Sequence, residues 1–410
     1  MQDNGSGWEK SAAIVWKRKN EETGMGKENI PLIRVEDMKK YYPVKGGIIT
    51  HTTGYVKAVD GVSFSVMKGQ TLGLVGESGC GKSTIGRQLV GLERPTDGKI
   101  YYHGRDLEEL QKNKKEMRAV RTKLQMIFQD PYSSLNPRKH IFEILAQPML
   151  YHHISEKESV EKDMVKILDM VGLPRAVLGR YPHEFSGGQR QRIGIAKALS
   201  LNPEFIVCDE PVSALDVSIQ AQILNLLKEL QKELGLTLLF VGHGLGAVNY
   251  VSDKIAVMYL GKIVEYGDAK EIFRSPVHPY TKALLEAVPI PDPQERGRER
   301  NLLQGEIGSS TNPPDGCRFH PRCPYAVEQC RHQPPRLQKI GSDPGKGKMI
   351  LPDHEKVQAA ELDMGKERKK DVTVDARQAA EESQKAQEKA HWAACPIVLE
   401  DRRYHAANLE

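Results

Sequence analysis

The sequence lacks any long apolar run, and this absence excludes one large class of protein. Of its 410 residues, 39% are hydrophobic and 28% are charged. No stretch approaches the roughly 18–20 apolar residues that a transmembrane helix requires. The first 30 residues are polar and mixed in charge, without the apolar segment of an export signal. We therefore expect neither an integral membrane protein nor an exported one.

Charge of one sign and cysteine are both scarce. The 59 basic and 54 acidic residues nearly cancel, which leaves a net charge of +5. This balance does not indicate a protein held to nucleic acid by phosphate charge, so we expect no nucleic-acid partner. Six cysteines in a chain of this length are too few for a disulfide scaffold.

Changes of composition divide the chain into segments. Residues 1–30 lack hydrophobic periodicity and predict a flexible N-terminal extension. Residues 31–287 alternate short apolar strands with amphipathic helices, which predicts one α/β domain. Residues 288–352 and 391–410 predict a small C-terminal accessory region that contains cysteines. Between them, residues 353–390 are dominated by Lys, Glu, Ala and Gln and predict a charged insert.

The hydrophobic pattern of the α/β domain places several of its elements. Continuous apolar runs predict strands buried on both faces, at residues 71–75, 205–208 and 237–241. Apolar residues at helical spacing predict a helix over 223–234. A hairpin is expected between strands 255–260 and 263–266, with its turn at Gly261-Lys262.

A phosphate-binding loop is the first chemical motif. Residues 76–83, Gly-Glu-Ser-Gly-Cys-Gly-Lys-Ser, fit the G-x-x-x-x-G-K-[ST] pattern, after a strand and before a helical stretch at 84–92. Glycines let backbone N–H groups face the phosphates, Lys82 is expected to reach the β- and γ-phosphates, and the Ser83 hydroxyl to bind Mg²⁺. The alternative is a glycine-rich structural turn. The residues expected at the nucleotide are Gly76, Ser78, Gly79, Cys80, Gly81, Lys82, Ser83 and Thr84.

Two carboxylates end the strand that starts at residue 205. Asp209 is expected to hold Mg²⁺ through water, because an aspartate at the carboxyl end of a buried strand suits that ion. The adjacent Glu210 is expected to orient the attacking water as a general base. Such pairs are more often solvated strand ends, but the phosphate-binding loop favours the catalytic interpretation.

The run Phe185-Ser-Gly-Gly-Gln189 resembles the signature motif of ATP-binding cassette (ABC) ATPases, with Phe where Leu is commoner. The resemblance implies a P-loop ABC-type nucleotide-binding domain of α/β class, with a helical subdomain at about 130–190. It also implies that ATP bound to the opposite subunit is contacted by Ser186, Gly187, Gly188 and Gln189. The alternative is a simple helix cap.

Further elements of that family follow in order along the chain. Gln129 matches the Q-loop, which senses Mg²⁺ and the attacking water and contacts the permease. Asp216 matches the D-loop at the dimer interface, and His243 matches the switch histidine near the γ-phosphate. Tyr42 aligns with the aromatic residue that stacks on adenine, and Tyr41 is the second choice.

The neighbours of His243 depart from the family pattern. An acidic residue usually follows the switch histidine, whereas here Gly242 and Gly244 flank it. Glycine removes side-chain anchoring, so we expect His243 to be held less rigidly.

Two segments resemble one branch of the family, the dipeptide and oligopeptide importers. They are residues 130–137, Asp-Pro-Tyr-Ser-Ser-Leu-Asn-Pro, and the His-Pro-Tyr segment within 275–285. The resemblance is strongest to the second ATPase of such importers, the F subunit. A nickel or metal-chelate importer ATPase shares much of this pattern, and a non-transport ABC ATPase or a non-hydrolysing regulatory subunit is a more distant alternative.

The resemblance also implies partners and a location. ATP and Mg²⁺ are the expected cofactors, sandwiched between this chain and a homologous ATPase subunit in a heterodimer. Two transmembrane permease subunits are expected to receive the motion, and an extracytoplasmic substrate-binding protein acts indirectly. The chain is expected to be peripheral, at the cytoplasmic face of the membrane.

The cysteines fall into two groups. Cys80 and Cys208 are expected to be small packing residues. The other four are spaced C-x5-C-x6-C-x64-C, and four thiolates suit either zinc or a four-iron, four-sulfur (4Fe–4S) cluster. The pattern resembles that of peptide-importer members that carry the cluster, which favours iron–sulfur over zinc or unligated thiols. The expected ligands are Cys317, Cys323, Cys330 and Cys395.

Overall fold

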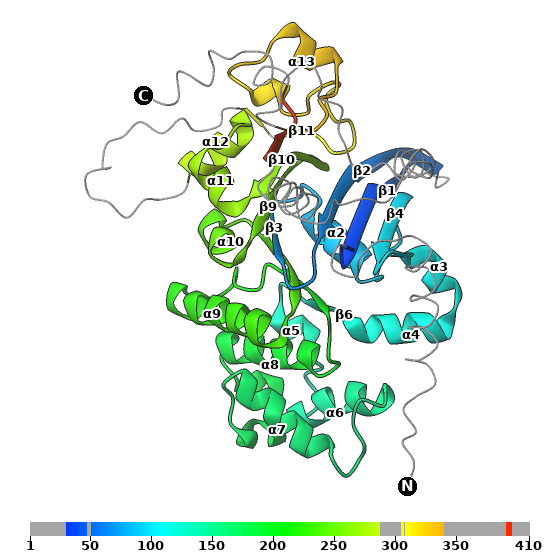
Figure 1. The fold of residues 1–410 in the computed structure, drawn as a ribbon, viewed down its shortest axis with the longest axis vertical. Coiled ribbons are helices and arrows are strands. Elements are labelled where there is room, and N and C mark those ends of the chain that lie inside the picture. The colour runs from blue at the N-terminus through cyan, green and yellow to red at the C-terminus, as the bar shows by residue number, and fades with distance from the viewer. Residues whose placement is uncertain (1–29, 47–50, 288–304, 307, 340–390, 396–410) are drawn as a thin grey trace, which may run out of the picture.

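An eight-stranded sheet and a four-stranded sheet organise the chain, and Figure 1 shows the helices around them. The computed structural model describes residues 30–46, 51–287, 305–306, 308–339 and 391–395. The expected N-terminal extension, apart from residue 30, and the expected charged insert lie outside the described residues.

The larger sheet has the strand order β11-β12-β10-β9-β3-β8-β7-β6. Strands β9, β3, β8, β7 and β6 pair in parallel, and the remaining pairs are antiparallel. The strands are β3 Thr71–Val75, β6 Leu124–Ile127, β7 Phe205–Asp209, β8 Thr237–Gly242, β9 Lys254–Tyr259, β10 Lys262–Asp268, β11 Gln338–Lys339 and β12 Trp392–Ala393.

The three strands predicted from continuous apolar runs are confirmed as β3, β7 and β8. Every residue of these strands is buried, as expected for parallel strands covered on both faces. The predicted helix over 223–234 is the second half of α9, Val217–Leu234. The helix after the phosphate-binding loop begins two residues earlier than predicted, at Lys82.

The predicted hairpin is present, but its turn lies one residue earlier than expected. Strand β9 ends at Tyr259, which pairs with Lys262 at the start of β10. Leu260 and Gly261 therefore form the two-residue turn, with φ values of 41° and 79°. Two consecutive positive φ angles are the mark of a hairpin turn whose twist matches its strands, and glycine accepts one of them without strain.

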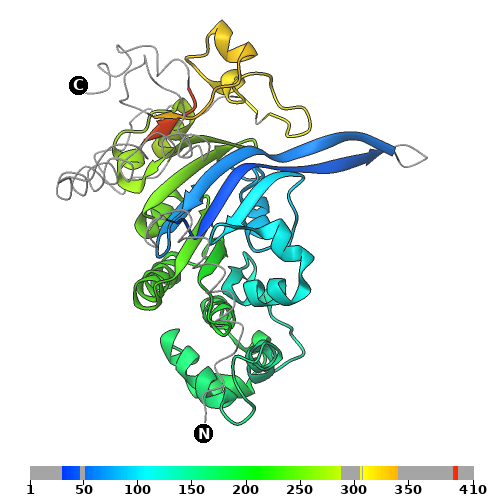
Figure 2. The same ribbon diagram turned by 45° about the vertical axis from the view of Figure 1, so that its right-hand side comes forward.

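The smaller sheet is antiparallel, in the order β2-β1-β4-β5. Figure 2 shows β1 and β2 continuing together as an arm well beyond the other strands. The strands are β1 Ile33–Gly46, β2 His51–Val66, β4 Asp97–Tyr102 and β5 Arg105–Asp106.

Helices cover the larger sheet and form a separate group in the lower part of Figure 1, where α6, α7 and α8 lie. The described helices are α2 Lys82–Leu89, α3 Leu107–Lys112, α4 Lys114–Lys123, α5 Pro131–Ser134, α6 Ile141–Tyr151, α7 Val160–Met170, α8 Gly187–Leu199, α9 Val217–Leu234, α10 Leu245–Val251, α11 Ala269–Arg274, α12 Pro279–Glu286 and α13 Glu328–His332. Among the described residues, none of these helices is long and apolar enough to cross a membrane.

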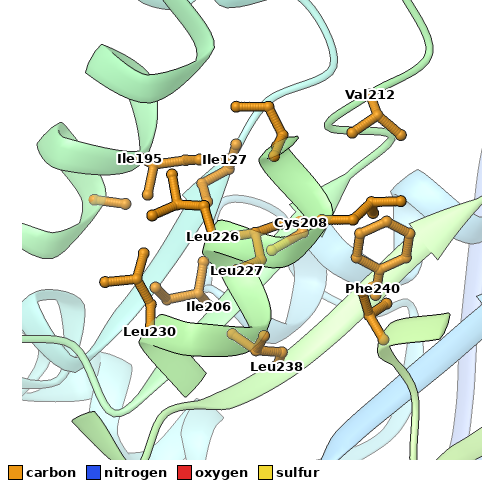
Figure 3. Close-up of a cluster of buried hydrophobic side chains, with 14 of the residues drawn as sticks. Ile127, Ile195, Ile206, Cys208, Val212, Leu226, Leu227, Leu230, Leu238 and Phe240 are labelled. Carbon is orange, nitrogen blue, oxygen red and sulfur yellow. The ribbon is translucent and has the colours of Figure 1, made fainter. Parts of the chain in front are cut away.

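A buried cluster joins the sheet to α8 and α9. Figure 3 shows Leu226, Leu227 and Leu230 of α9 facing side chains of β6, β7 and β8. Cys208 lies in this cluster and is fully buried, in agreement with its expected packing role. The cluster fixes α8 and α9 against the strands whose ends carry the candidate site.

The last described segment, residues 391–395, returns to the sheet. Strand β12 pairs with both β10 and β11. The His391 imidazole lies 2.6 Å from the Glu265 carboxylate, which also accepts hydrogen bonds from the N–H groups of Val277 and His278. Glu265 is fully buried, so this carboxylate joins three segments of the C-terminal half.

The packing of α10 on β3 gives a test of the fold. A Cβ on Gly73 would lie 2.4 Å from Val248 Cγ1 and 2.5 Å from Ser252 Oγ. We expect Gly73→Ala to lower the free energy of unfolding by about 1–3 kcal/mol, because α10 must shift to admit the methyl group. Chemical denaturation of the purified chain measures this loss.

Gly194→Ala is the matched control for this substitution. Gly194 lies inside α8, and among the described residues nothing lies within 4 Å of its ideal Cβ. We expect it to raise the free energy of unfolding by about 0.5–1 kcal/mol, because alanine restricts the unfolded chain. Equal effects of the two substitutions would contradict the described packing.

Candidate functional site

The loop between β3 and α2, residues 76–81, is shaped by glycines with positive φ. Gly76 has a φ of 154° and Gly81 a φ of 106°, and both approach backbone closely. A Cβ at Gly76 would lie 2.1 Å from the Met258 carbonyl oxygen, and one at Gly81 would lie 2.0 Å from that of Ala58. Only glycine fits these two positions, and the resulting tight backbone turn is of the kind that surrounds an anion.

The Lys82 ammonium points back into this loop. It donates hydrogen bonds to the carbonyl oxygens of Gly76 at 2.8 Å and Glu77 at 2.9 Å, and it is 3.7 Å from Cys80 Sγ. Lys82 is buried, so its charge acts with little screening by water. The loop and the start of α2 together form a positive, N–H-lined seat suited to a phosphate chain.

A hydroxyl and a carboxylate meet beside Lys82. Ser83 Oγ donates a hydrogen bond of 2.8 Å to Asp209 Oδ1 at the end of β7. Burial raises the pKa of Asp209, and the hydrogen bond from Ser83 partly opposes this rise. A serine hydroxyl and an aspartate oxygen are hard donors of the kind that Mg²⁺ prefers.

Glu210 collects two side chains from other loops. Gln129 Nε2 donates to Glu210 Oε2 at 2.8 Å, and His243 Nδ1 lies 3.5 Å from the same oxygen. Glu210 has a φ of 46°, a left-handed conformation that is strained for a residue with a side chain. Strain of this kind is typical of functional sites, and here it holds the carboxylate next to the amide and the imidazole.

His243 is the most loosely held of these groups. Its side chain is 62% exposed, and its Nδ1 lies 3.5 Å from the Glu210 carboxylate. Gly244 begins α10 without a side-chain cap, and nothing lies within 4 Å of its ideal Cβ. This environment agrees with the expectation that the flanking glycines provide no anchor.

Of the two candidate adenine-stacking tyrosines, Tyr42 lies nearer the phosphate-binding loop. Its hydroxyl bonds Glu93, and burial raises its pKa while a side-chain hydrogen bond with Thr84 lowers it. Thr84 belongs to α2, directly after the loop. The Tyr41 hydroxyl instead bonds Asp60. The structure therefore favours Tyr42 on position.

The Ser186–Gln189 run forms the start of α8. Ser186 Oγ accepts from the Gln189 N–H at 3.3 Å, and Gln189 Oε1 accepts from the Ser186 N–H at 3.1 Å, which is a reciprocal capping box. A Cβ on Gly188 would lie 2.5 Å from Ile219 Cγ2 of α9, so Gly188 allows α8 to approach that helix. Asp216 caps α9 by accepting from the Ile219 N–H.

These residues do not join the phosphate-binding loop within one chain. Among the described residues, no hydrogen bond or ion pair connects residues 186–189 or 216 with residues 76–84. The structure thus brings Lys82, Ser83, Asp209, Glu210, Gln129 and His243 together. It leaves the glycine-rich start of α8 apart from them.

The four C-terminal cysteines interact with one another electrostatically. Burial raises the pKa of Cys317 to about 12, and Cys395, Cys330 and Cys323 add to the rise. The pKa of Cys323 is raised to about 11, again mainly by burial, with Cys395 and Cys330 contributing. Cys395 therefore lies close enough to Cys317 and Cys323 to affect them, despite its distance in sequence. Within the described residues, however, no group of three or more His, Cys, Asp or Glu side chains is arranged to hold a metal ion.

Several contacts around the loop were not predicted from the sequence. The Glu77 N–H donates to the Tyr280 hydroxyl at 2.9 Å, and Arg322 Nη1 lies 2.9 Å from Glu77 Oε2. Arg318 bonds Asp60 and the Leu260 carbonyl oxygen. The position of both arginines next to cysteines, at 317–318 and 322–323, was the available signal.

Comparisons with known proteins agree on two regions. Residues 59–213 match the family described as "ABC transporter", and residues 264–330 match "Oligopeptide/dipeptide transporter, C-terminal region". These regions contain the phosphate-binding loop, Asp209, Glu210, the start of α8 and three of the four C-terminal cysteines.

Curated relatives match most of the chain. The oligopeptide transport ATP-binding protein AppF of Bacillus subtilis (strain 168) is 51% identical over 311 residues, 75% of this chain and 94% of AppF. The dipeptide transport ATP-binding protein DppF of Haemophilus influenzae is 51% identical over 315 residues, 76% of this chain and 94% of DppF. Neither description names an iron–sulfur cluster.

A solved structure shares the fold. It is described as a dimeric ATP-binding cassette in a post-hydrolysis state bound to ADP and Pi. Its sequence is 27% identical, its TM-score is 0.51, and the match covers 58% of this chain and 98% of that one.

The buried His278, which caps the start of α12, allows a test of the fold by pH. His278 Nδ1 accepts a hydrogen bond from the Tyr280 N–H at the start of α12, and burial lowers the pKa of His278 from 6.5 to about 4. The unfolded chain therefore binds a proton between pH 6.5 and 4 that the folded chain does not. Folding stability should fall as the pH is lowered through this window, by up to about 3 kcal/mol from this group.

His278→Asn isolates this contribution, because asparagine can cap the helix but does not titrate. We expect the wild-type chain to lose more unfolding free energy than the variant between pH 7 and 4, measured by urea denaturation. Parallel pH curves for the two chains would show that His278 is not held neutral by burial.

Proposed function

The chain belongs to the oligopeptide and dipeptide branch of the ABC transporter ATPases, and on that premise we propose that it binds and hydrolyses ATP to energise peptide import through a membrane permease. Identity of about half over three quarters of the chain is one support. The observation that carries the proposal is the meeting of Lys82, Ser83, Asp209, Glu210, Gln129 and His243 at one place. A glycine-rich structural turn would need none of these partners.

ATP and Mg²⁺ are assigned to the loop and its neighbours. The triphosphate lies along residues 76–84, with Lys82 at the β- and γ-phosphates. Ser83, Asp209 and Gln129 hold Mg²⁺, which when bound neutralises charge on the phosphates. Tyr42 stacks on the adenine ring, and its contact with Thr84 supports that position.

Hydrolysis depends on Glu210 as the general base. Its carboxylate would orient the attacking water and accept its proton. The Gln129 amide and the His243 imidazole would lie beside the γ-phosphate. The hydrogen bond from Gln129 and the nearby His243 imidazole place both partners on the same Glu210 oxygen. His243, exposed and flanked by glycines, is the weakest-held member of this set.

A second cassette completes the site. We assign the signature residues Ser186, Gly187, Gly188 and Gln189, with Asp216, to ATP held by a homologous partner subunit. Their separation from residues 76–84 of the same chain supports this assignment, as does the relative described as a dimeric cassette. ATP bridges two positive, glycine-lined surfaces, and its hydrolysis releases the pair.

The helical group is proposed to pass this motion to two permease subunits. An open groove of about 400 Å³ lies between α6 and the end of α8, lined by Asn136, Lys139, Gln147, Tyr151 and Lys197 among others. Phe128, which precedes Gln129 in the chain, and Tyr132 and Phe142 are exposed apolar residues. A permease segment seated there would sense the Q-loop directly. The extracytoplasmic binding protein acts through the permease, and the chain itself lies at the cytoplasmic face.

We propose a domain division that follows these roles. Residues 31–287 form the ATPase domain, with a helical subdomain at about 130–190. Residues 288–352 and 391–410 form the accessory region, and 1–30 and 353–390 are the extension and the insert. Pairing of β12 with β10 and β11 supports a tie between the accessory region and the ATPase domain.

The four C-terminal thiols are proposed to hold a 4Fe–4S cluster. Three buried thiols and the partly buried Cys323, which are coupled electrostatically, fit this soft group in chemistry. Zinc would also accept four cysteine thiolates, with the sulfurs about 2.3 Å from one ion. The cluster would join Cys317, Cys323, Cys330 and Cys395 and so tie the accessory region together.

The alternatives receive no specific support. The C-terminal match names oligopeptide and dipeptide transport rather than nickel, and Gln129 and His243 both lie beside the proposed base Glu210. We therefore retain peptide import as the function.

Substitution of Glu210 tests the hydrolytic assignment. We expect Glu210→Gln to lower ATP turnover by about a hundredfold or more, because the amide cannot accept the proton of water. ATP binding should persist, since Lys82 and the loop are unchanged. Phosphate release and nucleotide binding, measured on the assembled transporter, separate the two effects.

Glu229→Gln is the matched control, because Glu229 is an exposed residue of α9. Its turnover should equal that of the wild type. Near-normal hydrolysis by Glu210→Gln would remove the general base from the proposal.

The cluster has its own test. Protein purified without oxygen should be brown, with broad visible absorbance and about four iron and four sulfide per chain. Cys395→Ser should lower the iron content of the protein. Cys208→Ser, the control, should have the iron content of the wild type. Colourless protein with one zinc per chain would reject the cluster.

A further inference from the structure

The phosphate-binding loop is held from outside the ATPase motifs, at Glu77. This residue is the second of the loop, and its three polar groups all have partners. Its carbonyl oxygen accepts from Lys82 Nζ at 2.9 Å, and its N–H donates to the Tyr280 hydroxyl at 2.9 Å. Its carboxylate accepts from Arg322 Nη1 at 3.1 Å and 2.9 Å. Glu77 thus connects Lys82 with two residues of the C-terminal half.

Arg322 is fixed where it meets Glu77. Its side chain is 7% exposed, and its guanidinium lies 3.5 Å from the Tyr259 hydroxyl and 6.0 Å from the centre of that ring. The backbone N–H of Arg322 donates a hydrogen bond of 3.0 Å to the Phe319 carbonyl oxygen. Phe319 is buried and packs on the rings of Tyr259 and Tyr280, with centroids 5.3 Å and 5.4 Å apart. The same aromatic cluster therefore positions both partners of Glu77.

The charge of Glu77 makes this contact matter for an anionic ligand. A carboxylate in a loop that receives a triphosphate repels it, unless a cation lies beside the carboxylate. Arg322 is that cation, and its low exposure limits screening by water. Removal of Arg322 would leave a negative charge at the mouth of the site.

We propose that Arg322 is a positioning residue of the phosphate-binding loop, which neutralises and fixes Glu77 so that nucleotide affinity depends on residues 317–330, the segment that carries three of the four C-terminal cysteines. The inference rests on the proposed ATP site. Arg322 precedes Cys323 in the chain, and Arg318, which follows Cys317, reaches Asp60 and Leu260. Residues 317–330 therefore contact the ATPase domain at two points, through Arg318 and through Arg322.

Binding of a fluorescent ADP analogue to the purified full-length chain tests the proposal. We expect Arg322→Gln to raise the dissociation constant about tenfold, because Glu77 is left unpaired. Arg322→Lys keeps the positive charge and should stay within about threefold of the wild type. In the assembled transporter, Arg322→Gln should raise KM for ATP by more than it lowers kcat.

The decisive variant combines two substitutions. Glu77→Gln in the Arg322→Gln background removes the unpaired charge, and we expect it to recover most of the lost affinity. A packing defect would not be corrected by this second change. Arg331→Gln is the control, because Arg331 is an exposed residue directly after this segment and pairs with Glu328 at 3.6 Å. Its affinity should match the wild type.

Each outcome has one consequence. Unchanged affinity of Arg322→Gln, or a loss that Glu77→Gln does not reverse, overturns the positioning role while the ATP site stands. A wild-type chain that binds no nucleotide overturns the proposed function, and this inference with it. Thermal unfolding of every variant shows which chains are folded, and Arg322→Lys keeps the test valid if Arg322→Gln is not.

Discussion

The carboxyl edge of the parallel strands is the constraint on which the rest of the structure depends. The phosphate-binding loop follows β3, Gln129 follows β6, Asp209 ends β7, and His243 follows β8. Because parallel strands all end at the same edge, residues far apart in sequence meet there without long side chains. Glu210 is the point of contact, since Gln129 and His243 both approach one of its oxygens.

The position of Glu210 at this edge accounts for its strained backbone, and the glycine-rich start of α8 takes no part in the edge. The left-handed backbone at Glu210 turns its carboxylate along the edge. This conformation is strained, and the packing of the fully buried strand β7 stabilises it. The glycine-rich start of α8 lies elsewhere, capped by its own residues and packed on α9. Among the described residues, the start of α8 makes no hydrogen bond or ion pair with the phosphate-binding loop of the same chain.

Residues of the C-terminal half contact the phosphate-binding loop at this edge. Tyr280 and Arg322 both reach Glu77, and their positions depend on the aromatic packing of Tyr259 and Phe319. Glu265 adds a second tie, because it binds α12 through the N–H groups before it and the returning segment through His391. Residues 317–330, which carry three of the four C-terminal cysteines, thus contact the phosphate-binding loop through Arg322.

The sequence by itself determined the local chemistry. Apolar runs predicted β3, β7 and β8, because buried parallel strands need continuous hydrophobic residues, and glycine spacing predicted the loop, because Gly76 and Gly81 leave no room for a Cβ. It did not determine the hairpin turn at Leu260-Gly261, which strand register sets. The sequence also chose Tyr42 over Tyr41 and grouped Cys395 with the other cysteines, but only through a resemblance to a family. Only the tertiary structure decided that Tyr42 lies by Thr84 and that Arg322 meets Glu77. Those pairings join residues distant in sequence, and the packing of the whole chain selects them.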